Sequence, residues 1–500
     1  MSHKTSLLQE YPYLKTIQDL AQARNLTIHL VGGFLRDYFL HPPSRETTGP
    51  HHSSLDFDFA LKRGAVKFAR GFARTIQGAF VLLDQERGCA RVVKKKDAQI
   101  FIFDFADFRA PTLLRDLGRR DFTINTLCVN LRDLKETTDI LKIVRDFKKA
   151  IRDIKTKTIR MVSTGSFKED PLRLMRAFSL RATLNLKIEA RTLKRIQKDK
   201  ELLKEVSYER IRDELFKILG SPRAAENLKA MDTIGLLRVV IPQIEVMDNV
   251  PQGGYHHLDV WPHSLETVGQ LEGVFVQFQD DGDLREYLNE NLAGTRPRYA
   301  LMKLAGLLHD IGKPETRKKE NDRVSFHGHE HVGQKISRSI AKMLKLSIRE
   351  RHILEDLVRW HLRPGYLSNF KNPSERSIFR YFRDAQEEAA SILVLSLADQ
   401  RSTRGPLTTP EDQEHHEKIV TMLIKRYFEK KRERPLVRLI NGTDLIEELK
   451  LQPSPLFAKI LREVEEKQAL GKITNREEAL DLAREIAERQ GESRGQLDES

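Results

Sequence analysis

Cysteine and tryptophan are scarce in this sequence, with two of each among 500 residues. Two cysteines, Cys89 and Cys128, are too few to stabilise a chain of this length by disulfide bonds. Their scarcity excludes the disulfide-rich secreted class and predicts a reducing compartment, the cytoplasm. Long apolar runs are also missing. No run reaches the roughly 18 residues of a membrane-spanning helix, and the first residues lead into no signal-peptide core.

Acidic residues are outnumbered by basic ones. Lys and Arg total 86 against 72 Asp and Glu, a formal net charge of +14. Such a surplus favours a polyanionic partner, nucleic acid above all. Apolar residues make up 39% and charged residues 32%, a balance typical of a folded globular chain rather than a disordered or fibrous one. The length predicts roughly three domains.

The pattern of apolar residues changes at about residue 148. Before it, short runs rich in β-branched and aromatic residues predict a mixed sheet with a few helices. These runs lie at residues 27–31, 79–83, 90–93 and 100–105. After it, long stretches at helical spacing predict an all-helical remainder, so the fold class is α+β. Residues 280–297, rich in Asp, Glu, Asn, Gly and Pro, predict a loop or a poorly ordered insertion.

Two aspartates alternate with apolar residues in the segment Leu55–Phe59. Because residues i and i+2 of a strand share a face, Asp56 and Asp58 project side by side. Adjacent carboxylates repel each other unless a cation lies between them, and their oxygens suit Mg²⁺. A solvated strand edge is the ordinary interpretation of such a pair. Here it follows residues 32–37 (GGFLRD), where a glycine turn and Arg36 can approach a phosphate closely.

Four segments resemble the motifs of one enzyme family. They are 32–37 with Asp56-x-Asp58, then 119–125 (RRDFTIN), 169–176 (EDPLRLMR) and 209–215 (ERIRDEL). In this order they resemble motifs A, C, D and E of the tRNA nucleotidyltransferase/poly(A) polymerase family, the class II CCA-adding enzymes. Together they cover about half of the chain, and chance agreement on all four is negligible.

The resemblance implies a polymerase-β-like head in which two Mg²⁺ ions bind Asp56 and Asp58 and support in-line phosphoryl transfer to the tRNA 3′-hydroxyl. It implies addition of CMP and/or AMP, from CTP and ATP, to the tRNA 3′ end. The implied nucleotide-binding residues are Gly33, Arg36, Arg120, Asp121, Asn125, Asp170, Arg173 and Arg176. Asp121 could equally be a helix N-cap. Asp104, a conceivable third carboxylate, is interpreted as structural.

Asp170 and Arg173 offer a way to select bases. Three positions apart on one predicted helix, they would lie on the same face. A carboxylate accepts from the amino group of cytosine or adenine, and an arginine donates to a ring nitrogen or carbonyl, so the pair would reject guanine and uracil. The alternative is a surface ion pair between i and i+3. Within this motif we favour base selection.

Three features depart from the family pattern. Ser179 stands where the family often has another arginine, three residues beyond Arg176. Residues 41–54 contain three histidines and predict a long surface loop without metal ligands. The link from Phe105 to Leu117 is short, whereas many members carry a longer flexible loop there, needed for switching from C to A addition. CC-only or A-only addition therefore remains open.

A second set of ligands lies in the helical part. His263, the pair His309-Asp310 and the distant Asp399 follow the order of the HD phosphohydrolase domain, which they resemble. Imidazole and carboxylate ligands suit a divalent transition metal, and Asp310 could bridge two ions. Further histidines fall where some HD domains supply ligands: His329, His331 and His361. Each alone would be an ordinary core histidine, but the ordered set favours metal binding. Phosphohydrolase activity is a separate question, because HD domains in this family include active and structural ones.

The two resemblances together imply four domains. These are a nucleotidyltransferase head at 1–147, a helical neck for RNA and nucleotide recognition at 148–245, an HD domain at 246–405 and a C-terminal helical tail at 406–500. Residues 441–455 resemble the C-terminal segment of HD-bearing members. The basic runs at 94–96 and 425–434 could contact tRNA phosphates or could be ordinary solvated faces.

Two rival functions remain open. A poly(A) polymerase belongs to the same family, and the basic charge suits it. An HD metal phosphohydrolase whose head has become an RNA-binding module is the rival from another class. The HD ligands and residues 441–455 favour the tRNA enzyme over the first. The intact Asp56, Asp58, Asp170 and Arg173 argue against the second.

Overall fold

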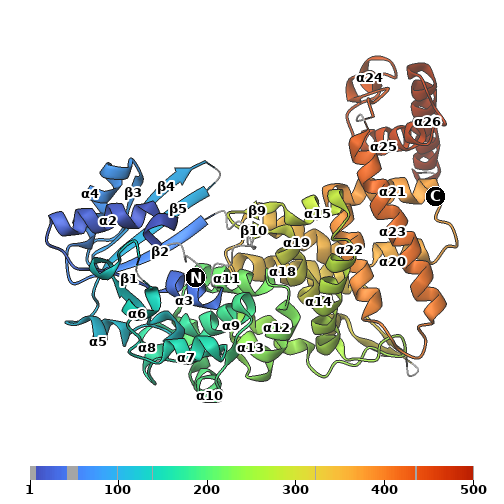
Figure 1. Cartoon of the computed structure of the whole chain (residues 1–500). Helices are drawn as coiled ribbons and strands as arrows, with labels where there is room; N and C mark the ends of the chain where they lie inside the picture. The colour runs from blue at the N-terminus through green and yellow to red at the C-terminus, as the bar shows by residue number, and fades with distance from the viewer. Residues whose placement is uncertain are drawn as a thin grey trace. The chain divides into compact units, whose positions relative to one another are not determined.

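The computed structural model describes residues 7–41, 54–97, 99–137, 139–320, 323–433 and 436–498. The chain forms two compact units, Met1–Ile218 with Ala230–Val240 and Leu219–Lys229 with Ile241–Ser500. Strands gather in the blue, N-terminal part of Figure 1, and helices fill the later part of the chain. Within the described ranges, no helix is long and apolar enough to cross a membrane. The predicted histidine loop falls almost wholly on 42–53, outside the described residues.

A six-stranded mixed sheet organises the first unit, in the order β3-β4-β5-β2-β1-β6. The strands are β1 (Ile28–Val31), β2 (Ser54–Leu61), β3 (Ala79–Asp84), β4 (Cys89–Lys96), β5 (Gln99–Asp107) and β6 (Cys128–Asn130). The central neighbours β2 and β5 run parallel, whereas the other neighbours run antiparallel. The predicted mixed sheet and α+β class are confirmed.

One face of this sheet carries the aromatic core. Phe57 of β2 stacks on Phe103 of β5 with 5.5 Å between ring centroids, and Phe59 stacks on Phe105 at 4.9 Å. Helix α4 (Ala65–Ile76) adds Phe68 and Phe72 to the same cluster. Since side chains alternate along a strand, burying these rings turns the aspartates of β2 to the opposite face.

Helices and a short parallel strand pair, β7 (Thr158–Ile159) with β8 (Lys187–Ile188), complete the first unit, so the prediction that the chain is all-helical after about residue 148 is wrong here. The helices that bear on the site are α8 (Ser166–Glu169), α9 (Arg173–Leu184), α10 (Ala190–Asp199), α11 (Tyr208–Leu219) and α13 (Leu236–Val240). Met175 and Phe178 of α9 and the preceding Leu172 are buried, as their apolar spacing predicts.

The second unit is built almost entirely of helices. Its central members are α14 (Val260–Gln277), α16 (Arg298–Leu308), α18 (His329–Met343), α19 (Ile348–Trp360) and α22 (Ala389–Arg401). Ten consecutive residues of α22, from Ala389 to Ala398, are buried, so this helix lies inside the unit.

The loop predicted at 280–297 is wrong. This segment forms α15 (Gly282–Asn289) followed by the short strands β9 (Asn291–Ala293) and β10 (Arg296–Pro297). The Asp281 carboxylate caps α15 by accepting from the backbone N–H of Leu284 at 3.0 Å. Leu284, Tyr287 and Leu288 are buried, so these three side chains anchor an otherwise polar helix.

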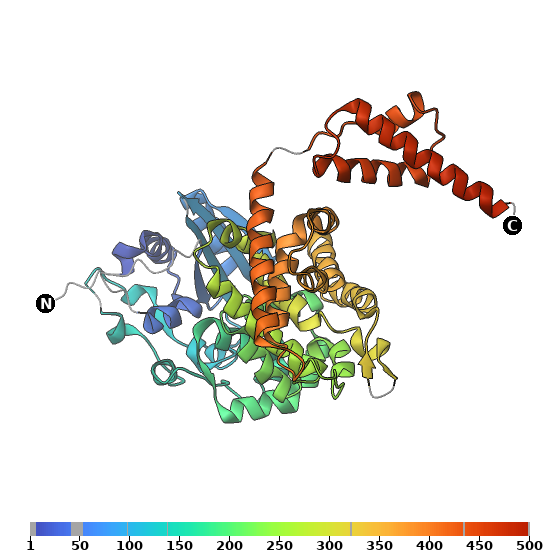
Figure 2. The same ribbon diagram turned by 90° about the vertical axis from the view of Figure 1, so that its right-hand side faces the viewer.

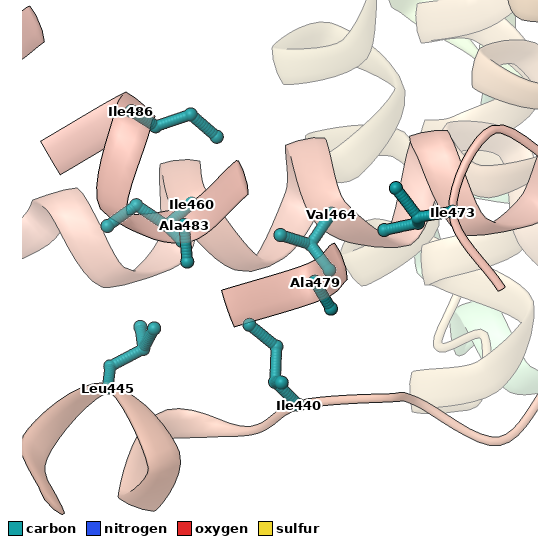
Figure 3. Close-up of a cluster of buried hydrophobic side chains, with 8 residues drawn as sticks. All are labelled: Ile440, Leu445, Ile460, Val464, Ile473, Ala479, Ala483 and Ile486. Atoms are coloured by element: carbon teal, nitrogen blue, oxygen red, sulfur yellow. The ribbon is translucent and has the colours of Figure 1, made fainter. Parts of the chain in front are cut away.

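The C-terminal part has a core of its own. After the long helix α23 (Pro410–Arg432), the helices α24 (Gly442–Glu447), α25 (Pro455–Ala469) and α26 (Arg476–Asp498) form a separate bundle (Figure 2). Figure 3 shows the buried side chains that hold it together: Ile440, Leu445, Ile460, Val464, Ile473, Ala479, Ala483 and Ile486. The buried Glu466 of α25 accepts from Arg376 and Arg380 of α21 (Glu375–Ala385), which attaches this bundle to the rest of the unit.

The basic run at the end of α23 has intramolecular partners. Arg426 donates to Glu375, and Arg432 donates to Asp283. The Lys430 ammonium lies 5.1 Å from the centroid of the Phe379 ring. These contacts favour the interpretation of this run as part of the protein's own packing.

Candidate active site and candidate metal centre

A glycine turn begins the site. Strand β1 ends at Val31, and α3 (Gly33–Leu40) begins two residues later, after Gly32. Gly32 has a φ of 81°, and a Cβ placed on it would lie only 2.4 Å from Asp58 Oδ2. Glycine alone therefore permits this close approach. The following Gly33 donates its backbone N–H to the Asp58 carboxylate.

Carboxylates form a row on the face of the sheet opposite the aromatic core. Asp58 lies opposite Asp104 in the register of β2 and β5, and Asp56 shares the face of β2 with Asp58. Burial raises the pKa of Asp58; the charge of Arg120 opposes this shift, and the charges of Asp104 and Asp56 add to it. Asp56 and Asp58 offer only oxygen donors and repel each other, so they fit a hard divalent cation such as Mg²⁺.

Asp104 forms a salt bridge with an arginine of the neighbouring strand. Arg91 of β4 donates Nε–H to Asp104 Oδ1 at 2.7 Å and a second N–H to Oδ2 at 2.8 Å. This paired geometry supports the structural interpretation of Asp104.

A cavity of about 290 Å³ opens beside this row. All eight residues predicted to bind the nucleotide line it, together with Gly32, Asp58 and Arg109. The eight are Gly33, Arg36, Arg120, Asp121, Asn125, Asp170, Arg173 and Arg176. Arg109 was not predicted as a site residue, because it lies on the short link after β5. Its place two residues after β5, which ends at Asp107, was the available signal.

Asp121 organises one wall of the cavity. Its Oδ1 accepts from Asn125 Nδ2 at 2.9 Å and from the backbone N–H of Phe122 at 2.8 Å, while Oδ2 accepts from Arg176 Nε at 2.9 Å. Burial alone would raise its pKa, but the Arg176 charge and these hydrogen bonds lower the pKa to about 2. The alternative of a helix N-cap is wrong, because Phe122 holds that position before the 3-10 turn Thr123–Asn125.

Arg36 and Arg120 lie against the same network. Arg36 donates to Asn125 Oδ1 at 2.9 Å and to both oxygens of Asp37. Arg120 donates to the carbonyl oxygen of Asn125 at 3.5 Å, and its buried Nε has no hydrogen-bond partner among the described residues. Because Arg120 also lines the cavity, its guanidinium suits an anionic ligand there.

The prediction that Asp170 and Arg173 share one helix face is wrong. Helix α8 ends at Glu169, Asp170 has an extended conformation (φ −151°, ψ 98°), and α9 begins at Arg173. The intervening Pro171 interrupts the helical pattern. Both side chains nevertheless line the cavity, because the turn between the two helices points them to the same space.

These two residues have different partners. Arg173 is 5% exposed and donates to the carbonyl oxygens of Arg119 at 2.6 Å and Ser166 at 3.1 Å. Asp170 accepts from Arg210 of α11 at 3.2 and 3.3 Å. The alternative of an ion pair between i and i+3 does not describe these contacts.

The departures from the family pattern have structural counterparts. Ser179 donates to the buried Glu214 of α11, which also lies 3.8 Å from Arg176 and accepts from Lys217. The serine therefore joins α9 to α11.

The short link after β5 is folded against the sheet. It contains α5 (Leu113–Leu117), whose Leu117 packs with Val31, Ala60 and Cys128. The buried Asp116 accepts from the backbone N–H of Arg109 at 2.8 Å. These contacts fix the position of Arg109 at the mouth of the cavity.

The predicted HD ligands meet around Asp310. Its Oδ2 lies 3.2 Å from His309 Nε2 and 3.7 Å from His263 Nε2. Its Oδ1 lies 3.3 Å from His329 Nε2 and 3.7 Å from His361 Nε2. Each oxygen thus faces a separate pair of imidazoles, in two groups whose candidate ligand atoms lie within 4.8 Å of one another.

Asp399 completes one of the two groups. Its Oδ1 lies 2.9 Å from His263 Nε2 and 3.6 Å from His309 Nε2. His331, in contrast, is exposed and contacts Glu330 at 2.8 Å, so it lies outside the cluster.

The imidazole rings are oriented by the backbone. Nδ1 of His309, His329 and His361 each lies 2.7–2.9 Å from the carbonyl oxygen three residues earlier. This arrangement fixes the tautomer and directs Nε2 towards Asp310. His309 Nε2 is buried and lacks a hydrogen bond of normal geometry in the described part of the chain, whereas Asp310 Oδ2 lies 2.6 Å from Lys313 Nζ. The convergence of imidazole Nε2 atoms on this carboxylate fits a bound transition metal.

Models of known protein families match four parts of the chain. They are the "Poly A polymerase head domain" at residues 28–160, the "Probable RNA and SrmB- binding site of polymerase A" at 185–247, the "HD domain" at 263–404 and a tRNA nucleotidyltransferase domain 2 at 389–483.

Curated relatives match most of the chain. The A-adding tRNA nucleotidyltransferase of Deinococcus radiodurans is 31% identical over 469 residues, 92% of this chain and 95% of that protein. The CC-adding tRNA nucleotidyltransferase of Thermus thermophilus is 28% identical over 465 residues, 90% of this chain and 91% of the relative. The multifunctional CCA protein of Neisseria gonorrhoeae is 26% identical over 399 residues, 78% and 87% of the two chains.

Solved structures share the fold. A CCA-adding enzyme in an apo form has a TM-score of 0.62 and 20% identity, covering 94% of this chain and 92% of the other. The Thermotoga maritima CCA-adding enzyme complexed with tRNA has a TM-score of 0.59 and 20% identity, covering 96% and 95%.

Proposed function

Because the chain belongs to the class II tRNA nucleotidyltransferase/poly(A) polymerase family with an HD domain, we propose that it transfers CMP and/or AMP from CTP and ATP to the 3′ end of tRNA. The observation that carries this proposal is the cavity that joins Asp58 to Asp170 and Arg173. It brings a carboxylate suited to phosphoryl transfer together with groups suited to selecting a base. The proposed domains are those given above: head 1–147, neck 148–245, HD domain 246–405 and tail 406–500.

The head supplies the groups for phosphoryl transfer. Asp56 and Asp58 would hold Mg²⁺, which when bound neutralises the triphosphate and lowers the pKa of the attacking 3′-hydroxyl. Arg120 lines the cavity, so its guanidinium is placed to donate to the anionic triphosphate. The backbone turn at Gly32 and Gly33 lets the ligand approach without a Cβ in the way.

The turn between α8 and α9 supplies the base-selecting groups. Arg173 is held by backbone carbonyls, so its guanidinium is fixed before the nucleotide arrives. Asp170 accepts from the amino group that cytosine and adenine share. Pre-organised partners reject guanine and uracil because a carbonyl facing Asp170 would leave two acceptors opposed.

A restricted specificity, CC-only or A-only, is part of the proposal. The compact link with α5 leaves little chain for the longer flexible loop of members that switch from C to A addition. Among the relatives, one that matches 92% of this chain is named A-adding and another that matches 90% is named CC-adding. Each name describes addition of only part of the CCA sequence.

Product length separates a tRNA enzyme from a poly(A) polymerase. A tRNA transcript lacking its terminal CCA, the same transcript ending in CC, and an unstructured RNA of equal length would be incubated with labelled CTP and ATP. We expect one to three nucleotides on at least one of the two tRNAs and none on the other RNA. Long adenylate tails on the unstructured RNA would support the poly(A) polymerase instead.

A metal phosphohydrolase is a second candidate activity, favoured by the position of Asp310 between two pairs of imidazoles. Metal analysis of the purified protein should find a transition metal, and simple phosphomonoesters and phosphodiesters should be hydrolysed only with that metal. Protein that binds no transition metal would exclude this activity. Bound metal without hydrolysis would indicate a structural site.

A further inference from the structure

A second cleft, of about 910 Å³, adjoins the nucleotide cavity within the first unit. Arg109, Asp170 and Arg173 line both spaces, so the two share part of their walls. Seven cationic and five acidic side chains line the second cleft. Those that lie beyond the nucleotide cavity and carry positive charge are Lys62, Arg63, Arg87, Arg119 and Arg210. The cationic excess suits the phosphates of a nucleic acid strand.

Arg210 stands where the two spaces meet. Its guanidinium donates to both oxygens of Asp170, at 3.2 and 3.3 Å, which is longer than a strong charge-assisted hydrogen bond. The Arg210 side chain is 53% exposed and that of Asp170 is 31% exposed. An exposed and loosely bonded ion pair exchanges partners readily. Arg173, held by buried carbonyls, does not have this freedom.

We propose that Arg210 is a positioning residue that couples the binding of an RNA phosphate in the second cleft to base selection by Asp170. A phosphate oxygen pair matches the guanidinium fork better than the loosely held carboxylate does. When RNA binds, Arg210 moves its hydrogen bonds from Asp170 to the phosphate. Asp170 then presents both oxygens to the amino group of the incoming base. This inference rests on the proposed function and names the residue that links its two substrates.

Nucleotide affinity with and without RNA tests the coupling. The dissociation constants of CTP and ATP would be measured alone and with a tRNA that ends in a 3′-deoxynucleotide and therefore cannot react. For the natural protein, we expect RNA to tighten binding of the accepted nucleotide by roughly fivefold, the size of one exposed ion pair. For Arg210→Ala, we expect tight nucleotide binding already without RNA and no further gain when RNA is added.

Two further variants control for general effects. Arg210→Lys keeps a cation that can exchange between Asp170 and phosphate, so we expect it to restore part of the RNA-dependent gain. Arg238→Ala removes a similar ion pair, in which Arg238 lies 3.1 Å from Asp232, and Arg238 lines neither space. This control should keep the full gain. Melting curves would confirm that all three variants are folded.

The outcomes separate this inference from the proposed function. An RNA-dependent gain that survives in folded Arg210→Ala would overturn the coupling through Arg210. A natural protein that extends tRNA yet shows no RNA-dependent gain would also overturn it while leaving the proposed function intact. If the natural protein extends no tRNA at all, the proposed function itself fails.

Discussion

At the scale of single residues, Asp56 and Asp58 carry the chemical step of the proposed function. Asp58→Asn keeps the shape of the side chain but removes the charge that holds a metal. We expect nucleotide addition to fall by at least a factor of about 10²–10³, because stabilisation of the developing charge is lost. Asp56→Asn should reduce nucleotide addition by a similar factor. Single-turnover extension of tRNA measures the effect.

Asp84→Asn is the matched control, since Asp84 ends a strand of the same sheet. It should keep near-natural activity. Substantial transfer by folded Asp58→Asn would remove this carboxylate from the catalytic role.

Asp121 gives a prediction about stability and pH. Its pKa of about 2 in the folded state lies below the ordinary value of 3.8, so its contribution is complete above about pH 4 and is lost as the pH falls towards 2. Asp121→Asn should lower the free energy of unfolding at pH 7 by about 2 kcal/mol. Urea unfolding at pH 7 and pH 3 would measure this. A difference between the two proteins that does not shrink at pH 3 would contradict the assignment.

Base selection is better tested at Asp170 than at Arg173. Replacing Arg173 would also release the carbonyls of Arg119 and Ser166, so a changed specificity could reflect a moved backbone. Asp170→Asn keeps the shape and adds a donor that can face a carbonyl. We expect the discrimination against UTP and GTP to weaken by about 1–3 kcal/mol. If kcat/KM ratios for CTP, ATP and UTP stay unchanged in the variant, Asp170 does not select the base.

At the scale of elements, the sequence predicts the sheet well and the turns poorly. The strands are predictable because Phe57, Phe59, Phe103 and Phe105 must share a buried face, which fixes the alternation. Helix α15 was missed because its composition is that of a loop, and its three buried anchor residues act only in the folded protein. The break at Asp170 was missed although Pro171 signals it.

The site residues also divide into those that the sequence predicts and those that only the fold brings into place. Motif order identified Asp58 and eight further residues of the cavity lining, because each stands in a recognisable segment. Arg109 lies outside these segments, and Arg210 lies in the segment 209–215, but its contact with Asp170 depends on the fold. The position of Arg109 depends on Asp116 and the contact of Arg210 depends on the approach of α11, and neither follows from local spacing.

Helix α19 carries a testable capping box. The Ser347 hydroxyl accepts from the backbone N–H of Glu350, whose carboxylate accepts from the N–H of Ser347. Ser347→Ala should lower the free energy of unfolding of the second unit by about 1 kcal/mol. His361 lies at the other end of the helix, so metal content should not change. A loss of metal without a loss of stability would contradict this account of the helix.

At the scale of the whole molecule, the two candidate sites belong to different units, and we expect them to act independently. Asp310→Ala should lose transition-metal binding and any phosphohydrolase activity while it keeps nucleotide addition. Imidazole-rich sites favour transition metals, whereas the Asp56–Asp58 pair prefers Mg²⁺.

Unfolding must be controlled in this experiment, because loss of a buried ligand can destabilise a helical unit. Melting curves of Asp310→Ala should therefore accompany both activity measurements. A well-folded Asp310→Ala protein that cannot add nucleotides would make the HD region part of the transferase.

The most direct test of the proposed function is extension of three tRNAs, ending in the discriminator base, in C, and in CC, with CTP, ATP, UTP or GTP supplied separately. We expect that at least one of them gains CMP or AMP, that UTP and GTP are not incorporated, and that Asp58→Asn extends the same tRNA at least about 10²–10³-fold more slowly. Restricted specificity predicts either CMP on the first two tRNAs alone or AMP on the third alone. Failure of all three tRNAs to gain a nucleotide would contradict the central claim.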